Sequence, residues 1–410
     1  MTKRILLLSH SFPPYVYPES YLIVKRLGNL KNSQIDVLTM DTFFPWVRKD
    51  DEFSIYAEKQ FASVLRLQPP SWYKKLPFSK GELLFSAPDA YLYLLPLYLK
   101  KLKSIDLKKY DVVITWSMYH SVHLLGPFLK RKNPDINWVA HFSDPWVNNP
   151  FRKRFFLTES INRYLEKLIF RKVDKVIFTS EFTLRNFKKT YPKCQQKASF
   201  IPHNFVDDLY PKVIDKNNLF LIRYIGSFYK ERSPLPLIKA LKILHNDHPN
   251  FLSLHKVRIE LIGSSEFDIS GILDGLPVGV VQGRLPVSYI ESLNLMKESD
   301  LLLVIDAPFE DSPFLPSKIS DYFGAEKPIF AICSTGTTRN IIEEVGLPVA
   351  HPNDYQEIAN KLKLAIEYSF DTNSEKYQTQ RDNFSKNTTE DKLLNIIYPN
   401  KIKQGAVPDN

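Results

Sequence analysis

The chain has 410 residues, of which 44% are hydrophobic and 24% charged, and its formal net charge is +10. This length exceeds what one hydrophobic core usually holds, so we expect two or three domains of a globular protein. No apolar run approaches about 18 residues, so the sequence predicts no membrane-spanning helix. Two cysteines, Cys194 and Cys333, exclude a disulfide framework and a thiolate metal cluster, and they favour a reducing cytoplasm.

The charge is divided unevenly along the chain. Residues 1–200 carry 33 lysines and arginines against 17 acidic residues, whereas the remainder carries 22 against 28. A membrane surface, a polyanionic substrate and nucleic acid each fit such a basic half, and so does a simple gain in solubility. Nucleic acid is the weakest of these alternatives because the sequence contains no recognised nucleic-acid-binding module.

The chain opens as a βαβ unit. Lys3 to Leu8 is a predicted strand, residues 19–30 have apolar residues at helical spacing, and Gln34 to Leu38 is the next strand. This order predicts a parallel sheet with right-handed crossovers. The loop at residues 10–20 contains no glycine, so the G-x-G-x-x-G motif of a dinucleotide site is absent.

Residues 43–109 are rich in aromatic and basic side chains, among them Trp72 and Tyr91. That composition fits a membrane interface or a sugar chain. The tyrosines and leucines of 90–102 are equally explained by one buried helix.

Two further strands are predicted at Asp111 to Trp116 and at Trp138 to Phe142. The second ends in Ser143-Asp144-Pro145-Trp146, and open α/β sheets place their ligands at the carboxyl ends of their strands. Asp144 is therefore a functional candidate and His141 a weaker one, with an ordinary Asp-Pro turn as the alternative. Residues 152–172 predict a basic amphipathic helix, and charge runs of this kind are most often solvated faces.

The composition changes near residue 208, where a polar linker separates a second βαβ series. Phe220 to Tyr224 is a predicted strand, and a turn from Gly226 to Pro234 joins it to a helix at 235–247. Later strands are predicted at Val257 to Ile262 and at Val278 to Gln282. Gly283 and Arg284 follow the last of these in a turn.

The segment 301–332 holds the clearest candidate site. Leu301 to Ile305 predicts a buried strand, and Ser317 is a plausible N-cap of the helix that carries Lys318 and Asp321. The start of a helix beyond a parallel strand favours a phosphate group, and Lys318 would add a positive charge. The alternative is a solvated first turn, such as every α/β protein contains.

Taken together, the ordered landmarks of the chain resemble family-4 retaining glycosyltransferases of the GT-B architecture. The likeness extends over nearly the whole chain and is weakest over 43–109. It rests on the order and spacing of the segments RILLLSHSFPP, SVHLLGPFLKRK, WVAHFSDPW, DKVIFTSEFT, IPHNF, YIGSFYKERSP, LIKAL, IELIG, VQGRLP, SDLLLVI and PSKISDYFGAEKPI.

The resemblance implies an α/β fold of two Rossmann-like βαβ domains that face each other across a cleft. We expect an acceptor-binding domain at 1–208, a nucleotide-sugar-binding domain at 209–375, and a helical tail at 376–410 that packs back on the first domain. It also implies that residues of the second domain bind the donor, while Asp144 faces the donor sugar or the acceptor.

The resemblance assigns roles to particular side chains. Lys230, Arg232 and Lys318 would neutralise the departing diphosphate, where charge develops during transfer. Asp321 would hold the ribose hydroxyls. The remaining donor-binding residues implied by the resemblance are Gly226, Ser227, Gly283, Arg284, Pro316 and Ser317.

The sequence departs from the family pattern at Pro313, where relatives carry a first acidic residue. Glu310 and Asp311 lie nearby but out of register, so the backbone N–H groups available within residues 314–316, those of Phe314 and Leu315, would serve instead. The usual arginine after the glycine is Ser227, and the glycine pair of the first loop is replaced by residues 15–18.

The implied activity is transfer of a sugar, with retention, from a nucleoside diphosphate sugar to a polysaccharide or lipid-linked glycan. We expect no cofactor beyond the donor substrate, no metal ion and no nucleic-acid partner. We expect the protein in the cytoplasm, with peripheral contact between its basic first domain and an anionic inner membrane face. The alternatives are a sugar-nucleotide epimerase or hydrolase of the same architecture, and a catalytically silent nucleotide-sugar-binding protein.

Overall fold

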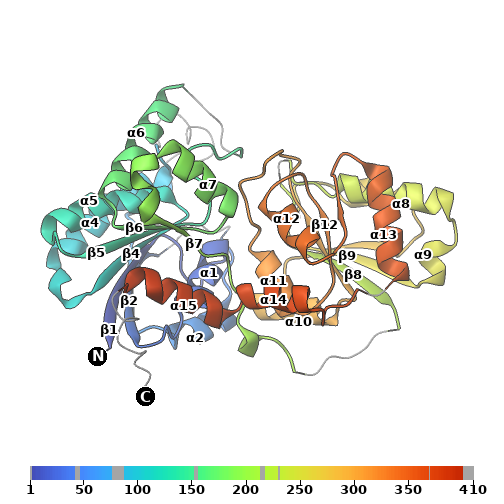
Figure 1. Ribbon diagram of the computed structural model, residues 1–410, viewed down its shortest axis with the longest axis horizontal. Helices are drawn as coiled ribbons and strands as arrows, with labels where there is room; N and C mark the ends of the chain where they lie inside the picture. Colours follow the sequence, from blue (N-terminus) through green and yellow to red (C-terminus); the bar gives the residue numbers. More distant parts are fainter. Residues whose placement is uncertain are drawn as a thin grey trace, which may run out of the picture. The chain divides into compact units, whose positions relative to one another are not determined.

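The computed structural model describes residues 2–41, 47–75, 87–151, 156–212, 218–229, 231–368 and 370–399. The chain forms two compact units, each built on one parallel sheet (Figure 1). The first unit comprises Met1–His203 together with Asn387–Asn410, and the second comprises Asn204–Lys386. Within the described ranges no helix is long and apolar enough to cross a membrane.

The sheet of the first unit has seven strands in the order β3-β2-β1-β4-β5-β6-β7, and all neighbouring strands are parallel. The chain adds strands outward from β1 on one side and then outward from β4 on the other. The strands are β1 (Lys3–Ser9), β2 (Ser33–Met40), β3 (Ser63–Leu67), β4 (Val112–Ser117), β5 (Asn137–Phe142), β6 (Lys175–Phe178) and β7 (Ala198–Phe200).

Helices connect these strands and cover the sheet. They are α1 (Pro18–Leu27), α2 (Asp51–Glu58), α4 (Leu95–Ser104), α5 (Gly126–Lys132), α6 (Phe156–Lys172) and α7 (Glu181–Thr190). The stretch 90–102 is buried on one side as expected, although it begins as a 3-10 turn at Ala90–Leu94 before α4. Both α2 and β3 fall in the part of the aromatic and basic stretch before residue 90, where the sequence predicted no element.

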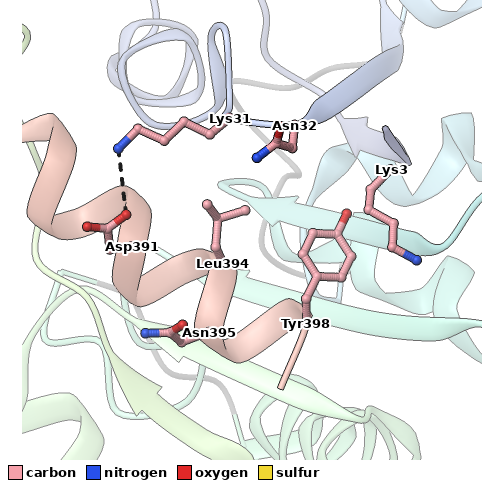
Figure 2. A pocket seen from close by; sticks show the side chains of 7 residues that line it. All are labelled: Lys3, Lys31, Asn32, Asp391, Leu394, Asn395 and Tyr398. Atoms are coloured by element: carbon pink, nitrogen blue, oxygen red, sulfur yellow. Dashed lines mark ion pairs between the residues drawn. The ribbon is translucent and has the colours of Figure 1, made fainter. Parts of the chain in front are cut away.

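The last helix, α15 (Lys386–Ile397), packs on the first unit. The Lys31 N–H donates to the Glu390 carboxylate at 2.6 Å, and the Asn137 amide donates to the Ile397 carbonyl at 3.0 Å. A groove of about 360 Å³ lies between this helix and the loop before β2, and Lys31 and Asp391 form an ion pair across it at 3.6 Å (Figure 2).

The sheet of the second unit has six strands in the order β10-β9-β8-β11-β12-β13, again all parallel. These strands are β8 (Phe220–Ile225), β9 (Val257–Ile262), β10 (Val281–Arg284), β11 (Leu301–Ile305), β12 (Ile329–Ile332) and β13 (Val349–Ala350). The helices are α8 (Leu235–Asp247), α9 (Phe251–Leu254), α10 (Tyr289–Glu298), α11 (Lys318–Gly324), α12 (Thr337–Glu344), α13 (Tyr355–Glu367) and α14 (Glu375–Asn383).

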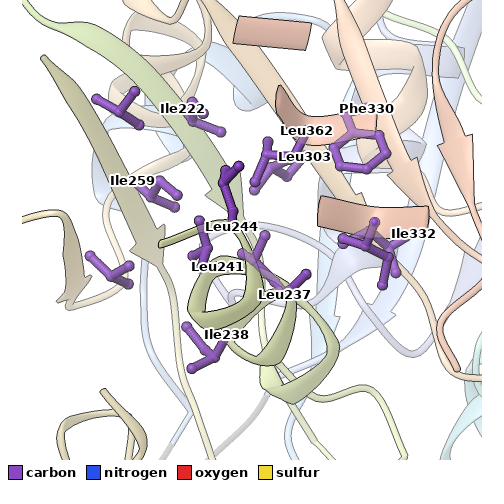
Figure 3. Packing of buried hydrophobic residues seen from close by; sticks show 14 of the residues in the cluster. Ile222, Leu237, Ile238, Leu241, Leu244, Ile259, Leu303, Phe330, Ile332 and Leu362 are labelled. Carbon is purple, nitrogen blue, oxygen red and sulfur yellow. The ribbon is translucent and has the colours of Figure 1, made fainter. Parts of the chain in front are cut away.

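The core of the second unit lies between this sheet and the helices α8 and α13. Leu237, Leu241 and Leu244 of α8 recur at helical spacing and pack toward strand residues such as Ile222 and Leu303 (Figure 3). Burying each such side chain contributes roughly 1.5–3 kcal/mol. The expectation of two Rossmann-like α/β domains is confirmed, and both sheets follow the strand order of a doubly wound fold.

The strand β10 is placed differently from the prediction, because it runs over Val281–Arg284 and not over 278–282. Gly275 and Gly279 both have positive φ, 86° and 84°, so the chain between them turns and cannot continue a strand. Val278 is fully exposed in this turn. Gly283 and Arg284 therefore belong to the strand itself and not to the turn after it.

Candidate functional site

The strand order of the second sheet reverses direction between β8 and β11. Loops that leave the carboxyl ends of two such strands diverge, and open α/β sheets bind their ligands at this switch point. Gly226 directly follows β8, and Asp306 directly follows β11. The predicted donor-binding residues Gly226, Arg232 and Lys318 all belong to the two segments that leave these strands.

Two glycines allow close contacts at this point: Gly226 allows the approach of Lys318, and Gly263 allows the approach of the Gly226 carbonyl. The φ of Gly226, 152°, lies in the region that residues with a Cβ rarely adopt, and its N–H donates to the Ile262 carbonyl at 2.8 Å. A Cβ at this position would lie 2.3 Å from the Nζ of Lys318, and a Cβ on Gly263 would lie 1.9 Å from the Gly226 carbonyl oxygen. The absence of a side chain at residue 226 is therefore what admits the Lys318 ammonium.

The side-chain nitrogen of Lys318 is buried and has no hydrogen-bond partner among the described residues. This Nζ is shielded from solvent, donates to none of those residues, and lies 3.7 Å from the centroid of the Tyr224 ring. Burial holds the pKa of Lys318 well below its usual value, the charge of Arg232 lowers it further, and Asp306 acts against both. An unsolvated ammonium group beside a glycine loop is arranged to receive an anion.

Arg232 does not lie free for a ligand, because it forms an ion pair with Asp306 at 2.8 Å. Its guanidinium also donates to the Tyr229 hydroxyl at 3.2 Å. Burial alone would lower the pKa of Arg232, but the carboxylate of Asp306 more than reverses this and raises it. The pair fixes a positive group close enough to Lys318 to influence its protonation. The Nε of Arg232 is also buried and has no hydrogen-bond partner among the described residues.

Asp321 lies one turn beyond Lys318 and is only 5% exposed. The Tyr289 hydroxyl donates to its carboxylate at 3.0 Å, and the Tyr210 hydroxyl donates to its backbone carbonyl at 2.7 Å. These bonds tie α11 to the start of α10 and to the segment that enters the second unit. The ribose-binding role of Asp321 stays a prediction.

The helix that carries Lys318 begins without the expected side-chain cap. Ser317 occupies the position before α11, but its backbone is helical and its hydroxyl caps no N–H group. The Pro316 carbonyl accepts from the Ile319 N–H at 3.0 Å, and the Ser317 carbonyl accepts from the Ser320 hydroxyl at 2.8 Å. The Ser317 side chain is thus not used as an N-cap.

Three other predicted residues lie around this point. The Ser227 hydroxyl accepts from the Ser264 hydroxyl at 2.6 Å. Arg284 forms an ion pair with Glu260 at 3.0 Å, and its carbonyl accepts from the Gly263 N–H at 3.0 Å. Gly283 is exposed on β10. Lys230 lies outside the described residues.

The loop that enters α11 is fastened by the acidic residues near Pro313. Glu310 bonds to the His351 Nε2 at 3.0 Å and accepts from the Thr335 hydroxyl at 3.0 Å. The Ser312 N–H donates to the Thr335 carbonyl at 2.9 Å. Glu310 therefore anchors this loop to the ends of β12 and β13.

In the first unit, Asp144 follows β5 and lies beside a carboxyl group that the sequence analysis did not single out. Glu19, at the start of α1, is 6% exposed. Burial, and next the charge of Asp144, raise the pKa of Glu19 from 4.5 to about 7, against the N–H groups of Glu19 and Met118, which lower it. Glu19 and Asp144 together form a carboxylate pair at the carboxyl edge of the first sheet.

His141, the weaker candidate, belongs to the core and not to a site. Its side chain is 2% exposed, and its ring stacks on Trp116 with centroids 3.4 Å apart. Burial lowers the pKa of His141 well below its usual value, and the charge of Arg26 lowers it further. The ring is therefore neutral.

Sequence reasoning missed Asp306, Tyr224 and Glu19. Asp306 is a polar residue directly after a strand, so the rule that selected Asp144 could also have found it. Tyr224 reads as an ordinary strand residue, and nothing in its context indicates that its ring lies under a lysine. Glu19 looks like a solvated first-turn carboxylate of a helix.

Several solved structures share this architecture. HepE from Anabaena, in complex with UDP and glucose, has 17% sequence identity and a TM-score of 0.66, with 97% of this chain and 100% of that chain covered. Sucrose-phosphate synthase from Thermosynechococcus elongatus has 16% identity and a TM-score of 0.66, with 95% and 97% covered. A glycosyltransferase from Rickettsia africae has 15% identity and a TM-score of 0.64, with 99% and 100% covered.

No protein-family model matches the chain, and no curated protein matches it either. At these low identities the likeness to solved structures establishes the fold alone. The chain has the GT-B fold, and the glycosyltransferases among its structural neighbours share it over nearly their whole length.

Proposed function

We propose that the protein is a retaining glycosyltransferase of the family-4 type, which transfers a sugar from a nucleoside diphosphate sugar to a polysaccharide or lipid-linked glycan. The observation that carries the proposal is the buried Lys318 ammonium beside Gly226 at the switch point of the second sheet, which no described residue accepts a hydrogen bond from. A diphosphate would supply the missing anion. The structural neighbour solved with UDP and glucose supports this class of donor.

In this proposal Lys318 binds a diphosphate oxygen and stabilises the charge that develops as the sugar leaves. The Arg232–Asp306 pair holds a second cation nearby, and Lys230 completes the set by its place in the sequence. Asp321 binds the ribose, and Ser227, Gly283, Arg284, Pro316 and Ser317 complete the donor site. Asp144 and Glu19 lie on the acceptor side.

We also propose that these cations take the place of a metal ion, so that transfer persists in EDTA. The retaining outcome rests on the sequence resemblance.

The two described cysteines are both free and buried, which fits the cytoplasm as the working compartment. Peripheral contact of the basic first unit with the inner membrane face belongs to the same proposal.

The test begins with a thermal-shift screen against nucleotide sugars, because a ligand that binds only the folded protein raises its melting temperature. Lys318→Met keeps an unbranched side chain that is one atom shorter and removes its charge. We expect this variant to bind UDP about 10–100-fold more weakly, the value of one charge-assisted hydrogen bond. Lys376→Met removes an exposed lysine of the same unit and serves as the matched control.

Full UDP affinity and turnover in Lys318→Met would refute the site. NMR of the product distinguishes the possible reactions. In a retaining transfer, the anomeric configuration of the sugar in the product is the same as in the donor. A free sugar formed without acceptor would indicate a hydrolase, and an altered nucleotide sugar an epimerase. Binding without turnover across a broad acceptor panel would indicate a silent binding protein.

A further inference from the structure

The outer face of α6 carries three exposed apolar side chains. Leu157 is 69% exposed, Ile161 41% and Tyr164 67%. They recur at intervals of four and three residues, so they lie on one side of the helix within about 10 Å of its length. Single exposed apolar residues are normal on a protein surface, but a row of three along one helix face calls for a partner.

The opposite face of α6 already anchors the helix. Ile169 and Phe170 belong to the core of the first unit. Asn162 accepts from the Trp146 indole N–H at 2.8 Å, and Glu166 accepts from the Val147 N–H at 3.0 Å. The exposed row is therefore not needed to hold the helix in place, and α6 is apolar on two sides.

The segment of the chain that contains the exposed row is strongly basic. Residues 156–197 contain ten lysines and arginines against four acidic residues. On α6 itself Lys167, Arg171 and Lys172 are exposed, and Glu166, one of the four acids, is buried. A helix that presents exposed apolar side chains together with exposed cations matches the interface of an anionic bilayer, where the apolar groups enter the acyl boundary and the cations meet the headgroups.

The position of α6 relates this surface to the acceptor side. The helix follows β5, so its first turn with Leu157 lies toward the carboxyl edge of the first sheet, the edge at which Asp144 stands. We propose that the exposed row Leu157, Ile161 and Tyr164, with the basic segment that contains it, docks the protein on an anionic membrane. The corollary that the acceptor is membrane-borne rests on the proposed function, whereas docking itself does not.

The experiment is vesicle flotation of the full chain, with phosphatidylcholine vesicles that contain or lack about one third phosphatidylglycerol. We expect flotation only with the anionic vesicles, and its loss as salt is raised, because screening shortens the reach of the cations. The triple variant Leu157→Ser, Ile161→Ser, Tyr164→Ser keeps the charge and should lower the partition coefficient by about tenfold or more.

The matched control is Leu254→Ser, Leu364→Ser, Tyr368→Ser, which removes the same number of exposed apolar side chains from the second unit. It should float like the wild type. Equal flotation of the two triple variants would overturn the proposal, and so would absence of wild-type flotation on anionic vesicles. Mass photometry tests the alternative that the partner is a second copy of the chain. If the wild type and the control variant are dimers and the α6 variant is a monomer, the proposal is wrong.

Flotation requires no donor, acceptor or turnover. A protein that floats through α6 but transfers no sugar would refute the proposed function and leave the docking surface intact. A protein that transfers sugar to soluble acceptors but never floats would refute the docking surface, and with it the proposed membrane contact, and leave the proposed sugar transfer intact.

Discussion

Replacing Glu19 with glutamine should make the stability of the first unit less dependent on pH. Glu19 is buried beside Asp144, and these two causes raise its pKa from 4.5 to about 7. Because the folded-state pKa lies above the unfolded one, the carboxyl group is protonated in the fold at low pH. The stability it then contributes is complete below pH 4.5 and is lost as the pH rises through 7.

The size of the effect follows from the two pKa values. A difference of 2.5 pKa units, taken from the values 4.5 and about 7, corresponds to about 3 kcal/mol in the fully titrated limit. Between pH 5 and pH 8 linkage gives a loss of about 2–3 kcal/mol. Glutamine has no proton to lose in this pH range. The free energy of unfolding of Glu19→Gln, compared with that of the wild type, should therefore rise by this amount between pH 5 and pH 8.

Tryptophan fluorescence is the right signal for this measurement. All five tryptophans of the chain occur before residue 204, so the emission reports on the first unit. Urea unfolding of the wild type and of Glu19→Gln at pH 5, 6, 7 and 8 gives the difference in unfolding free energy at each pH, from which the other titrating groups largely cancel.

Two further variants make the result specific. Asp144→Asn removes the second cause of the raised pKa, so it should shrink the pH dependence of the wild type without abolishing it. Glu58→Gln changes an exposed glutamate of the same unit and should give a difference independent of pH. A difference between Glu19→Gln and wild type that stays constant from pH 5 to pH 8 would refute the reasoning.

The second unit supports three more predictions. Gly226→Ala should displace the Lys318 ammonium and weaken UDP binding by calorimetry, because the new Cβ would lie 2.3 Å from it; unchanged affinity would contradict the close approach. Arg232→Met should destabilise the second unit by about 3–5 kcal/mol, because it leaves the Asp306 charge buried and unpaired, and adding Asp306→Leu should restore much of the loss. Circular dichroism can follow both variants, since this unit has no tryptophan. Gly324→Ala should cost about 1–3 kcal/mol in the same assay, because its Cβ would lie 2.4 Å from a tyrosine hydroxyl; a neutral result would show that the neighbouring segment yields.

The strands and helices were most predictable where an apolar run or an apolar helical pattern is bounded by acidic residues or proline. The strand Leu301–Ile305 and the helix Leu235–Asp247 begin and end at the predicted residues. The strand β10 was misplaced because Val278 is apolar and yet stands fully exposed between two glycines of positive φ. Local patterns report apolarity, whereas the backbone turn decides which apolar residues are buried.

The candidate site was predictable in part for a different reason. The resemblance to glycosyltransferases brought Gly226 and Lys318 into one hypothesis, and both belong to segments that leave the two strands at the switch point of the second sheet. It could not reveal that Arg232 pairs with Asp306, because the ion pair joins residues 74 positions apart. Nor could it reveal the burial of Glu19, since that depends on the loops after three separate strands.

The return of α15 to the first unit has a consequence for synthesis of the protein on the ribosome. Leu393 and Ile397 are each 2% exposed, so this last helix supplies part of the buried surface of the first unit. The ribosome releases the whole second unit before it releases these residues. The domain that begins first is therefore completed only after the second unit, and its nascent form must persist, with the surface that α15 will cover still exposed, until α15 has left the ribosome.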